Sequence, residues 1–491
     1  MNQVIDYHAI LPELILSGTV LMVLVVDVFL PARRKWLSMP VALLGVLASL
    51  AAVLTLLGER RSTFGGMFVV DNFAILFKLF FLTVAVVVLL LSLRYFREGG
   101  FYQGEYYFLL LTSFLGCVMM PSSRDMLLLF ISLELVSAPG FLMAAFRKGD
   151  IKSNEAGVKF FIIGVLSTAV MLFGMSLIYG LTGGSLRLVE IAAKLSTLPA
   201  QQETLALAAI LFVVVGFAFK VSAVPFQFWA PDTYEGAPVP VAAFLAVASS
   251  AAGFAGLLQL MFVAFIGQHE FWVPLFVFLS VATMFVGNLV ALQQTQVVRL
   301  LAYSGIAQAG YILLTFALVT DDQASNATAF QAAVVYILIY GIMTVGAFAV
   351  AVAVSRRHPA LRLEDFGGLA KTAPILAVGM TVFMISLAGV PPTGGFWAKI
   401  FIFRAAIDRG GSLGIWLAVL MLVNSVISVA YYFAVPRQMI FKEPADASPL
   451  RAPWLVTAVV SVATLAIVVL FILPNPFARL AELSTLVGIG T

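Results

Sequence analysis

The sequence predicts an all-α polytopic membrane protein, and three observations lead to that fold class. Of its 491 residues, 62% are hydrophobic and only 11% are charged. The mean hydropathy of +1.07 is far from the balance of a water-soluble domain. Apolar runs of about 20 residues, the length that crosses a bilayer, recur along the whole chain. We therefore expect about fourteen transmembrane helices and no soluble domain.

The expected spans follow one another with short polar gaps. They lie near residues 10–30, 37–57, 71–93, 106–120, 125–146, 156–181, 205–224, 238–266, 271–292, 298–319, 329–354, 373–403, 412–435 and 453–473. The three longest gaps are predicted to be loops, at 58–70, 182–203 and 355–372. Within the second gap, Leu188, Ile191 and Leu195 recur at helical spacing, which predicts a short helix at the membrane interface.

Basic residues are unevenly distributed between the two sets of loops. The loops after odd-numbered spans hold most of the loop lysines and arginines, including Arg33, Arg34, Lys35, Arg356 and Arg357. By the positive-inside rule these loops are cytoplasmic, and both termini then lie on the outer side of the membrane. The formal net charge of +4 is thus a signal of topology and gives no support for nucleic-acid binding.

The residue types that hold cofactors are scarce. The single cysteine, Cys117, falls inside the fourth span, which excludes an intrachain disulfide and a cysteine metal cluster. His8, His269 and His358 lie in or next to loops without acids at ligand spacing, so no metal or haem site is predicted. No glycine-rich phosphate loop follows a strand, and no nucleophile elbow is present. We expect no cofactor in this chain, and any redox chemistry must belong to partners.

Segment 217–241 combines a lysine with a helix break inside an apolar run. It reads FAFKVSAVPFQFWAPDTYEGAPVPV, with Lys220 five residues before Pro225. A charged side chain at the bilayer centre costs roughly 2.5–3.5 kcal/mol on insertion scales, so it persists against a partner or a water-filled cavity. Pro225 removes a backbone donor, and a broken membrane helix requires protein or water to satisfy the freed groups. A broken helix with an ionisable residue is typical of a transport site.

A second segment has a similar design. Pro391 and Pro392 interrupt an apolar run, and Lys399 follows them, whereas Lys220 precedes its proline. The reversed order favours an internal repeat of inverted orientation, a plan common among transporters. A chance match of proline and aromatic residues in a Phe-rich chain is the alternative.

Ionisable residues inside the predicted spans are the candidate functional groups. Glu134 is the acid placed clearly in mid-span, and the lysines within spans are Lys78, Lys159, Lys220 and Lys399. A Glu–Lys pair can exchange a proton when its hydration or a neighbour changes. We interpret Glu134, Lys220 and Lys399 as functional, with a structural ion pair as the alternative for Glu134. Lys159 could equally snorkel to the cytoplasmic surface, and a structural role is favoured for Lys78.

Five segments carry a resemblance to a known family: SLELVSAPGFLMAAF, KSNEAGVKFFIIGVLSTAVMLFGMSLIYG, FKVSAVPFQFWAPDTYEGAPVPVAAFLA, RLLAYSGIAQAGYILL and SLAGVPPTGGFWAKIFIFRAA. At these residues the chain resembles the antiporter-like membrane subunits of respiratory complex I, the NADH:quinone oxidoreductase. The helix count and outward termini extend the resemblance over essentially the whole chain. Each motif also occurs in multisubunit cation/proton antiporters, but the SNEAGVKFF segment and the overall length favour one kind of complex I subunit.

The resemblance implies a division of the chain into four parts. Helices 1–3 occupy residues 1–105, and helix 14 occupies 441–491. Between them lie two inverted five-helix repeats, helices 4–8 in 106–267 and helices 9–13 in 268–440. Each repeat is implied to form a half-channel for protons and to contain one broken helix, helix 7 or helix 12.

The resemblance also implies roles and partners. In that family the glutamate of the fifth helix pairs with the lysine of the broken seventh helix, here Glu134 and Lys220. Lys399 matches the lysine of the broken twelfth helix, which serves the outward exit, and Lys159 matches a relay lysine of the sixth helix. The implied partners are other membrane subunits of complex I, including neighbouring antiporter-like subunits, and the lipid bilayer. NADH, FMN, iron–sulfur clusters and quinone are expected in partner subunits.

The chain departs from the family pattern between its two broken helices. Where the eighth helix often carries a lysine, this sequence has Ser249 and Ser250, and Gln227 and Gln308 stand where histidines are frequent. Serine and glutamine hydrogen-bond water but cannot store a proton at neutral pH. We therefore expect water to bridge the two broken-helix lysines. The expected anchors of that water are Ser250, Tyr303, Gln308 and Gln227.

The predicted function is that of a proton-translocating membrane subunit, driven electrostatically by quinone reduction in neighbouring subunits. One alternative is a subunit of a multisubunit cation/proton antiporter, which would show sodium-dependent transport without quinone chemistry. Another is a mainly structural membrane subunit, in which the buried charges fix helix register. A solitary transporter of an organic solute is disfavoured, because no polar substrate cavity beyond these charges is indicated.

Overall fold

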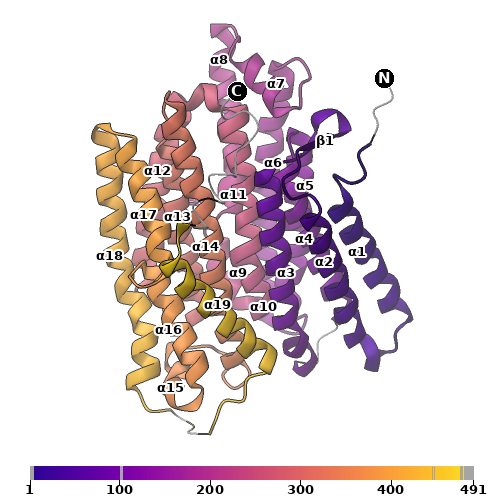
Figure 1. Ribbon diagram of the computed structural model, residues 1–491, viewed down its shortest axis with the longest axis vertical. Coiled ribbons are helices and arrows are strands. Elements are labelled where there is room, and N and C mark those ends of the chain that lie inside the picture. Colours follow the sequence, from indigo (N-terminus) through magenta and orange to yellow (C-terminus); the bar gives the residue numbers. More distant parts are fainter. Residues whose placement is uncertain (1–4, 100–102, 445, 447, 476–478, 480–491) are drawn as a thin grey trace.

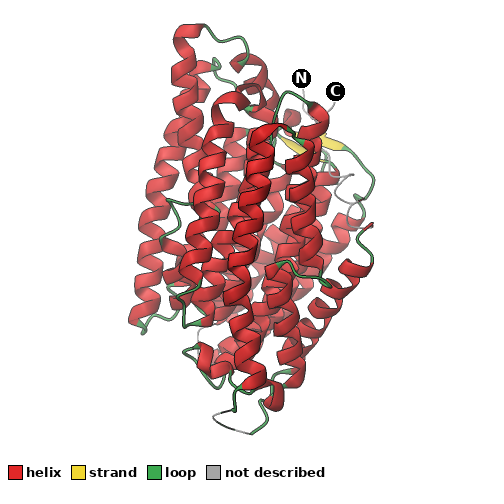
Figure 2. Cartoon of the chain, turned by 90° about the vertical axis from the view of Figure 1, so that its left-hand side faces the viewer, coloured by secondary structure: helices red, strands yellow, loops and turns green. Residues whose placement is uncertain are grey.

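A computed structural model describes residues 5–99, 103–444, 446, 448–475 and 479. Its long helices run side by side as one bundle, roughly along the vertical axis of Figures 1 and 2. The helices are α1 Leu11–Phe29, α2 Ser38–Leu54, α3 Asn72–Glu98, α4 Gln103–Met119, α5 Met126–Ala144, α6 Ile151–Leu181, α7 Leu188–Leu195, α8 Ala200–Lys220, α9 Trp229–Gly236, α10 Val239–Phe244, α11 Ser250–Gln259, α12 His269–Ala291, α13 Val297–Ala317, α14 Gln323–Ser355, α15 Leu369–Thr372, α16 Pro374–Ala388, α17 Gly394–Asp408, α18 Gly411–Phe441 and α19 Trp454–Ile472. Two short strands, β1 Arg61–Thr63 and β2 Phe68–Val70, pair antiparallel.

The spans agree with the predicted all-α polytopic fold. Twelve helical spans in the described residues are long and apolar enough to cross a membrane. The 17-residue helix α4 and the interrupted pair α16–α17 complete the fourteen expected spans. Their bounds lie close to the predicted ones because apolar length, which the sequence shows directly, decides where a membrane helix forms.

The centre of the bundle is formed by α13, α14 and the span Val239–Ala264. In α14 and in Val239–Ala264, 94% of an 18-residue apolar stretch is buried inside the protein, and in α13 the share is 83%. The corresponding share is 28% in α19 and 33% in α6 and α18, which form the periphery. Polar side chains on the central helices therefore meet other protein groups rather than lipid.

The connections contain two elements of secondary structure. The gap at 58–70 was predicted to be a plain loop, but it holds the β1–β2 hairpin, in which Arg61 is paired with Val70. A strand of three residues is too short for its alternation of apolar and polar side chains to be recognised from the sequence. The interfacial helix expected in 182–203 is confirmed as α7, which buries Leu188, Ile191 and Leu195.

Candidate functional site

The first helix break separates α8 from α9. α8 ends at Lys220, and α9 begins at Trp229. Between them the chain turns through Ser222, whose φ is +57°, and a cis bond before Pro225. The indole Nε1 of Trp229 donates to the carbonyl of Phe219 at 3.2 Å, which fastens α9 to the end of α8. The predicted break thus holds Lys220 at a helix terminus inside the bundle.

Lys220 is buried against α5, with 1% of its surface exposed. Its Nζ donates to the Oγ of Ser137 at 2.8 Å. Glu134, three residues earlier on α5, interacts with Lys220 through its charge, and its Oε1 accepts a hydrogen bond from the Oγ1 of Thr168 at 2.9 Å. No ion pair joins Glu134 to Lys220 among the described residues. The structure brings the expected pair close together but leaves Ser137 as the direct partner of the ammonium.

The second helix break lies between α16 and α17. α16 ends at Ala388, and the chain leaves it through Gly389, whose φ is +80°. A cis bond joins Pro391 to Pro392, and α17 begins at Gly394. Both breaks predicted from proline are therefore present, one in each half of the chain.

The side chain of Lys399, on α17, contacts the end of the preceding helix α16. Its Nζ donates to the carbonyl of Ala388 at 2.7 Å and to the Oγ of Ser425 at 2.6 Å. The same nitrogen lies 4.8 Å from the centre of the Tyr311 ring, an arrangement suited to a cation–π contact. Only 7% of Lys399 is exposed, and among the described residues no acid forms an ion pair with it. Neutral groups alone therefore surround this lysine.

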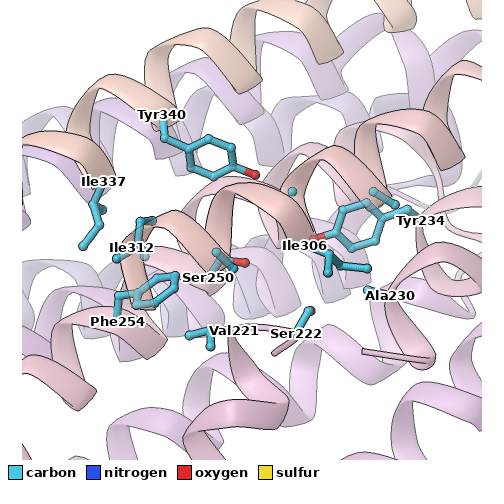
Figure 3. Close-up of a pocket in the computed structure, with 14 residues that line it drawn as sticks. Val221, Ser222, Ala230, Tyr234, Ser250, Phe254, Ile306, Ile312, Ile337 and Tyr340 are labelled. Atoms are coloured by element: carbon cyan, nitrogen blue, oxygen red, sulfur yellow. The ribbon is translucent and has the colours of Figure 1, made fainter. Parts of the chain in front are cut away.

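A small cavity lies between the two breaks. It has a volume of about 10 Å³, the space of about one water molecule. The polar residues on its wall are Ser222, Tyr234, Ser250 and Tyr340, and Figure 3 shows the hydroxyl groups of both tyrosines directed towards its middle. Ser250 follows a π-helical turn, Leu245–Ser249, and its Oγ donates to the carbonyl of Leu245 at 3.1 Å. The wider turn places a hydroxyl where the family often has a lysine.

A buried hydrogen-bonded group of four side chains lies beyond the cavity, and we call it the Gln308 cluster: Ser304, Gln308, Tyr336 and Tyr432. The Nε2 of Gln308 donates to the hydroxyl of Tyr432 at 2.9 Å and to the carbonyl of Leu387 at 3.0 Å. Tyr336 donates to the Oε1 of Gln308. The hydroxyl groups of Ser304 and Tyr432 lie 2.5 Å apart. Both ends of the Gln308 amide are thus satisfied by protein.

The Gln308 cluster connects the cavity with the second break. Tyr340, on the cavity wall, lies one helical turn after Tyr336 in α14. At the other side, Leu387 accepts from Gln308, and the next carbonyl, of Ala388, accepts from Lys399. The central helices therefore carry polar groups from near Lys220 to Lys399 without a central ionisable residue.

Lys159 lies in a different environment from the other two lysines. Its Nζ is 2.6 Å from Glu155 and 2.6 Å from Asp232, and 42% of its side chain is exposed. Asp232 also contacts Arg299 at 2.7 Å, and Arg299 reaches Glu235 at 2.9 Å. This network ties α6 and α9 to α13. The structure does not bring Lys159 into the buried contacts of Lys220.

The other two expected water anchors, Gln227 and Tyr303, belong neither to the cavity wall nor to the Gln308 cluster. Gln227 is 7% exposed and lies between α8 and α9, and its Oε1 has no hydrogen-bond partner among the described residues. Tyr303 is absent from the cavity wall and makes no side-chain hydrogen bond within the described part of the chain. The neighbouring Ser304 bonds Tyr432 instead. Gln227 therefore has an unused acceptor, whereas Tyr303 does not line the cavity.

Two further buried ion pairs lie near the β1–β2 hairpin. Lys78 is fully buried and pairs with Glu13 at 2.8 Å. Arg124 pairs with Asp71 at 2.6 Å and also donates to Gln259. These pairs join α1 to α3, and the start of α3 to the segment before α5 and to the end of α11. In these pairs each basic side chain contacts an acid, whereas Lys399 contacts only neutral groups.

Sequence reasoning missed the neutral members of the site. Ser137, Thr168, Tyr336 and Tyr432 sit in long apolar runs, where a single hydroxyl group hardly changes hydropathy. A usable signal exists for two of them. Ser137 lies three residues after Glu134 on the same helical face, and Tyr336 lies four residues before Tyr340.

Comparison with known proteins places this geometry in a family. Residues 123–428 match the family described as NADH:quinone oxidoreductase/Mrp antiporter, TM. A protein of Trichlorobacter lovleyi named NADH-quinone oxidoreductase subunit N is 40% identical over 465 residues, which cover 94% of this chain and 93% of the relative. The chain belongs to the NADH-quinone oxidoreductase subunit N family. The subunit favoured by the SNEAGVKFF segment and the chain length is thereby confirmed as subunit N.

Other subunit N relatives and solved structures agree with this assignment. A subunit N of Moorella thermoacetica is 39% identical and covers 97% of this chain and 98% of its own. A chain of respiratory complex I from Thermus thermophilus, solved with bound aureothin, aligns with a TM-score of 0.80 and 31% identity over 96% of this chain and 99% of its own. A chain of the Mrp complex from Dietzia sp. aligns over 98% and 97% with a TM-score of 0.84 but 21% identity, which shows a shared fold alone.

The described residues contain no group of three or more His, Cys, Asp or Glu side chains that could hold a metal ion. The buried lysines Lys78, Lys220 and Lys399 instead stand singly or in a pair with one acid. Such an arrangement can pass a proton from group to group.

Proposed function

We propose that this subunit N family member translocates protons across the membrane as part of an NADH-quinone oxidoreductase. The observation that carries the proposal is the pair of buried lysines, each at a helix break: hydroxyl groups line a cavity beside the first break, and Gln308 bonds the carbonyl of Leu387 at the second. Neither lysine is locked in an ion pair within the described residues, so a change of proton occupancy breaks no salt bridge. A mainly structural role would favour buried lysines that are paired with an acid, as Lys78 is with Glu13.

The proposed path runs from Lys220 to Lys399. A proton leaving Lys220 passes to one water held by Ser250 and Tyr340 in the cavity. From there it is proposed to reach Lys399 through further water, which the hydroxyl groups of the Gln308 cluster and the carbonyl groups that end α16 hold by hydrogen bonds without carrying the proton themselves. Hydroxyl groups both donate and accept, so they can hold such water in either orientation without storing charge.

Glu134 is proposed to control the first lysine. Its carboxylate lies one helical turn from Ser137, the direct partner of Lys220. Because charge interactions are strong in a buried site, a shift of charge in an adjacent subunit that moves Glu134 changes how firmly Lys220 holds its proton. Lys159 is proposed to supply this site from its half-exposed ion network with Asp232.

The energy is proposed to come from partner subunits. NADH, FMN, iron–sulfur clusters and quinone belong to those subunits, and this chain contributes no redox centre to the proposal. The repeats 106–267 and 268–440 are proposed as the two half-channels, in a bacterial inner membrane with both termini on the periplasmic side. A cation/proton antiporter shares the fold, but the relatives at about 40% identity are subunits N.

The test is quinone-coupled proton uptake in inverted membrane vesicles at equal amounts of assembled complex. Lys220→Ala is expected to abolish most uptake while the complex remains intact. Lys442→Ala, which removes an exposed lysine beyond α18, is the matched control and is expected to leave uptake unchanged. Full pumping in Lys220→Ala would contradict the proposal, and sodium-dependent uptake without quinone would favour the antiporter alternative.

A further inference from the structure

An apolar groove opens on the side of the bundle, apart from both lysine sites. It encloses about 470 Å³ between α3, α14 and α19. In Figure 1, α19 crosses obliquely in front of α14 with its start beside the end of α3. Apart from Thr83, its wall is apolar, and small residues of α14 and α19 deepen it, namely Gly341, Ala458, Ala463 and Ala466.

The groove has the length of one membrane leaflet. Along α3, which runs with the long axis of the bundle, it extends from Phe80 to Leu90, about 15 Å at the rise of an α-helix. Half of the hydrocarbon thickness of a bilayer is about 15 Å. Trp454 is 70% exposed at the start of the groove, and tryptophan is enriched at the boundary between hydrocarbon and headgroups. The groove therefore begins at a headgroup layer and ends near the middle of the membrane.

Arginines gather at the Trp454 end of the groove. Arg356 holds this end together, because its guanidinium bonds Glu98 of α3 at 2.8 Å and the carbonyl of Arg451 at 2.6 Å. Arg94 lies one turn beyond Leu90, on the face of α3 that lines the groove. Both Arg94 and Arg451 are exposed, and neither guanidinium has a hydrogen bond or ion pair among the described residues.

Two neighbouring charged groups at this end are already paired, whereas Arg97, in the last turn of α3, is exposed and has no ion pair among the described residues. Glu98 is bonded by Arg356, and Arg357 contacts Asp446 at 3.6 Å. Arg94 and Arg451 are thus an unneutralised positive charge above an apolar channel of leaflet length. Each basic side chain near a headgroup layer attracts anionic lipid.

We propose that this groove binds one anionic phospholipid, with its acyl chain between α3, α14 and α19 and its phosphate at Arg94 and Arg451. A helix of a neighbouring subunit is the competing occupant. A twelve-residue helix about 10 Å across and 18 Å long fills roughly 1,400 Å³, which is more than the 1110 Å³ of empty space in the groove. A lipid chain enters such a groove, whereas a helix could only cover its opening. The bound lipid would wedge α19, the most lipid-exposed of the spans, against the bundle.

The test uses the assembled complex in bilayers of phosphatidylcholine that contain a trace of phosphatidylglycerol with a photoreactive acyl chain. After irradiation, labelled peptides are located by mass spectrometry. Label is expected on α19 between residues 454 and 466, and Ala458→Trp, which fills the groove, is expected to lower it to the level of the α18 surface. Leu465→Trp is the matched control, because Leu465 is 64% exposed on the same helix and lies outside the groove.

A second pair of variants separates headgroup recognition from mere contact with lipid. Arg94→Gln with Arg451→Gln is expected to lower the phosphatidylglycerol label roughly thirtyfold, since each basic residue near the headgroups contributes about 1 kcal/mol and two are removed. Arg437→Gln with Lys442→Gln removes two exposed charges, one in the last turns of α18 and one just beyond it, and is expected to change nothing. Equal labelling by photoreactive phosphatidylcholine and phosphatidylglycerol would overturn the anionic site. A groove that stays unlabelled and cross-links to a partner subunit would overturn the lipid.

Discussion

The two broken helices hold their lysines in opposite ways. Lys220 is the last residue before its break and has a carboxylate one turn from its direct partner, Ser137. Lys399 follows its break and is surrounded by a carbonyl, a hydroxyl and an aromatic ring. The first site can be controlled by changing a charge, whereas the second responds only to local dipoles and hydration. In the proposed function, the same backbone device would thus serve an input that can be regulated and an output that is passive.

The largest expected effect is at the second lysine. Lys399→Met removes the only ionisable group of its site, and proton-transfer groups typically contribute 10²-fold or more, so uptake should fall by about 100-fold. Glu134→Gln leaves Lys220 and Ser137 in place and should lower uptake less. Proton uptake in inverted vesicles at equal assembled complex measures both. Equal losses would show that the second site is also under the control of an acid.

The next effect concerns the glycines that admit the lysines. At Gly389, with φ of +80°, a Cβ would lie 2.5 Å from the Cδ of Lys399, and at Gly253 a Cβ would lie 2.9 Å from the Cγ of Lys220. Gly389→Ala combines left-handed strain with overpacking, about 3 kcal/mol, whereas Gly253→Ala meets overpacking alone, about 1–2 kcal/mol. Thermal denaturation of the assembled complex should follow this order. If Gly389→Ala destabilised the complex less than Gly253→Ala, the side chain of Lys399 would have room to move away from the added methyl group.

A smaller effect is expected in the Gln308 cluster. Tyr432→Phe removes the hydroxyl group shared by Gln308 and Ser304 and orphans a buried donor, at a cost of about 1–3 kcal/mol. Uptake should fall several-fold while quinone reduction persists. Tyr303→Phe is the matched control, because Tyr303 makes no side-chain hydrogen bond within the described residues. A loss in Tyr303→Phe alone would restore Tyr303 as the water anchor and move the path to another face of α13.

The smallest effect is expected at the Asp6–Arg61 ion pair, which lies outside both lysine sites and serves as a reference. Hydrogen bonding from Arg61 holds the pKa of Asp6 below its ordinary value of 3.8, and this pair tethers the N-terminal segment to β1. Because the folded pKa is the lower one, the stabilisation is present above pH 3.8 and is lost as the pH falls through the folded pKa. Hydrogen exchange of the hairpin should increase on acidification in the native protein, relative to Asp6→Asn. Pumping should not follow this change.

The sequence predicted the spans and both breaks because length, hydropathy and proline act locally. It also placed Glu134 close to Lys220, although their direct contact is replaced by Ser137. It did not predict the Gln308 cluster, since Tyr336 and Tyr432 come from helices about a hundred residues apart in the chain and only packing joins them. The roles of all these residues stay predictions until the relay variants are measured.

The partners of the two lysines differ in when they are synthesised. Ser137 precedes Lys220 in the chain, so the hydrogen-bond acceptor of this lysine is already present when α8 enters the membrane. Lys399 depends on Ser425, which belongs to α18 and is made later. During insertion α17 must therefore carry its lysine across the bilayer with Ala388 as its one earlier hydrogen-bond partner. A ribosome stalled before α18 would hold the second half of the protein open at the membrane, while the first half is already complete.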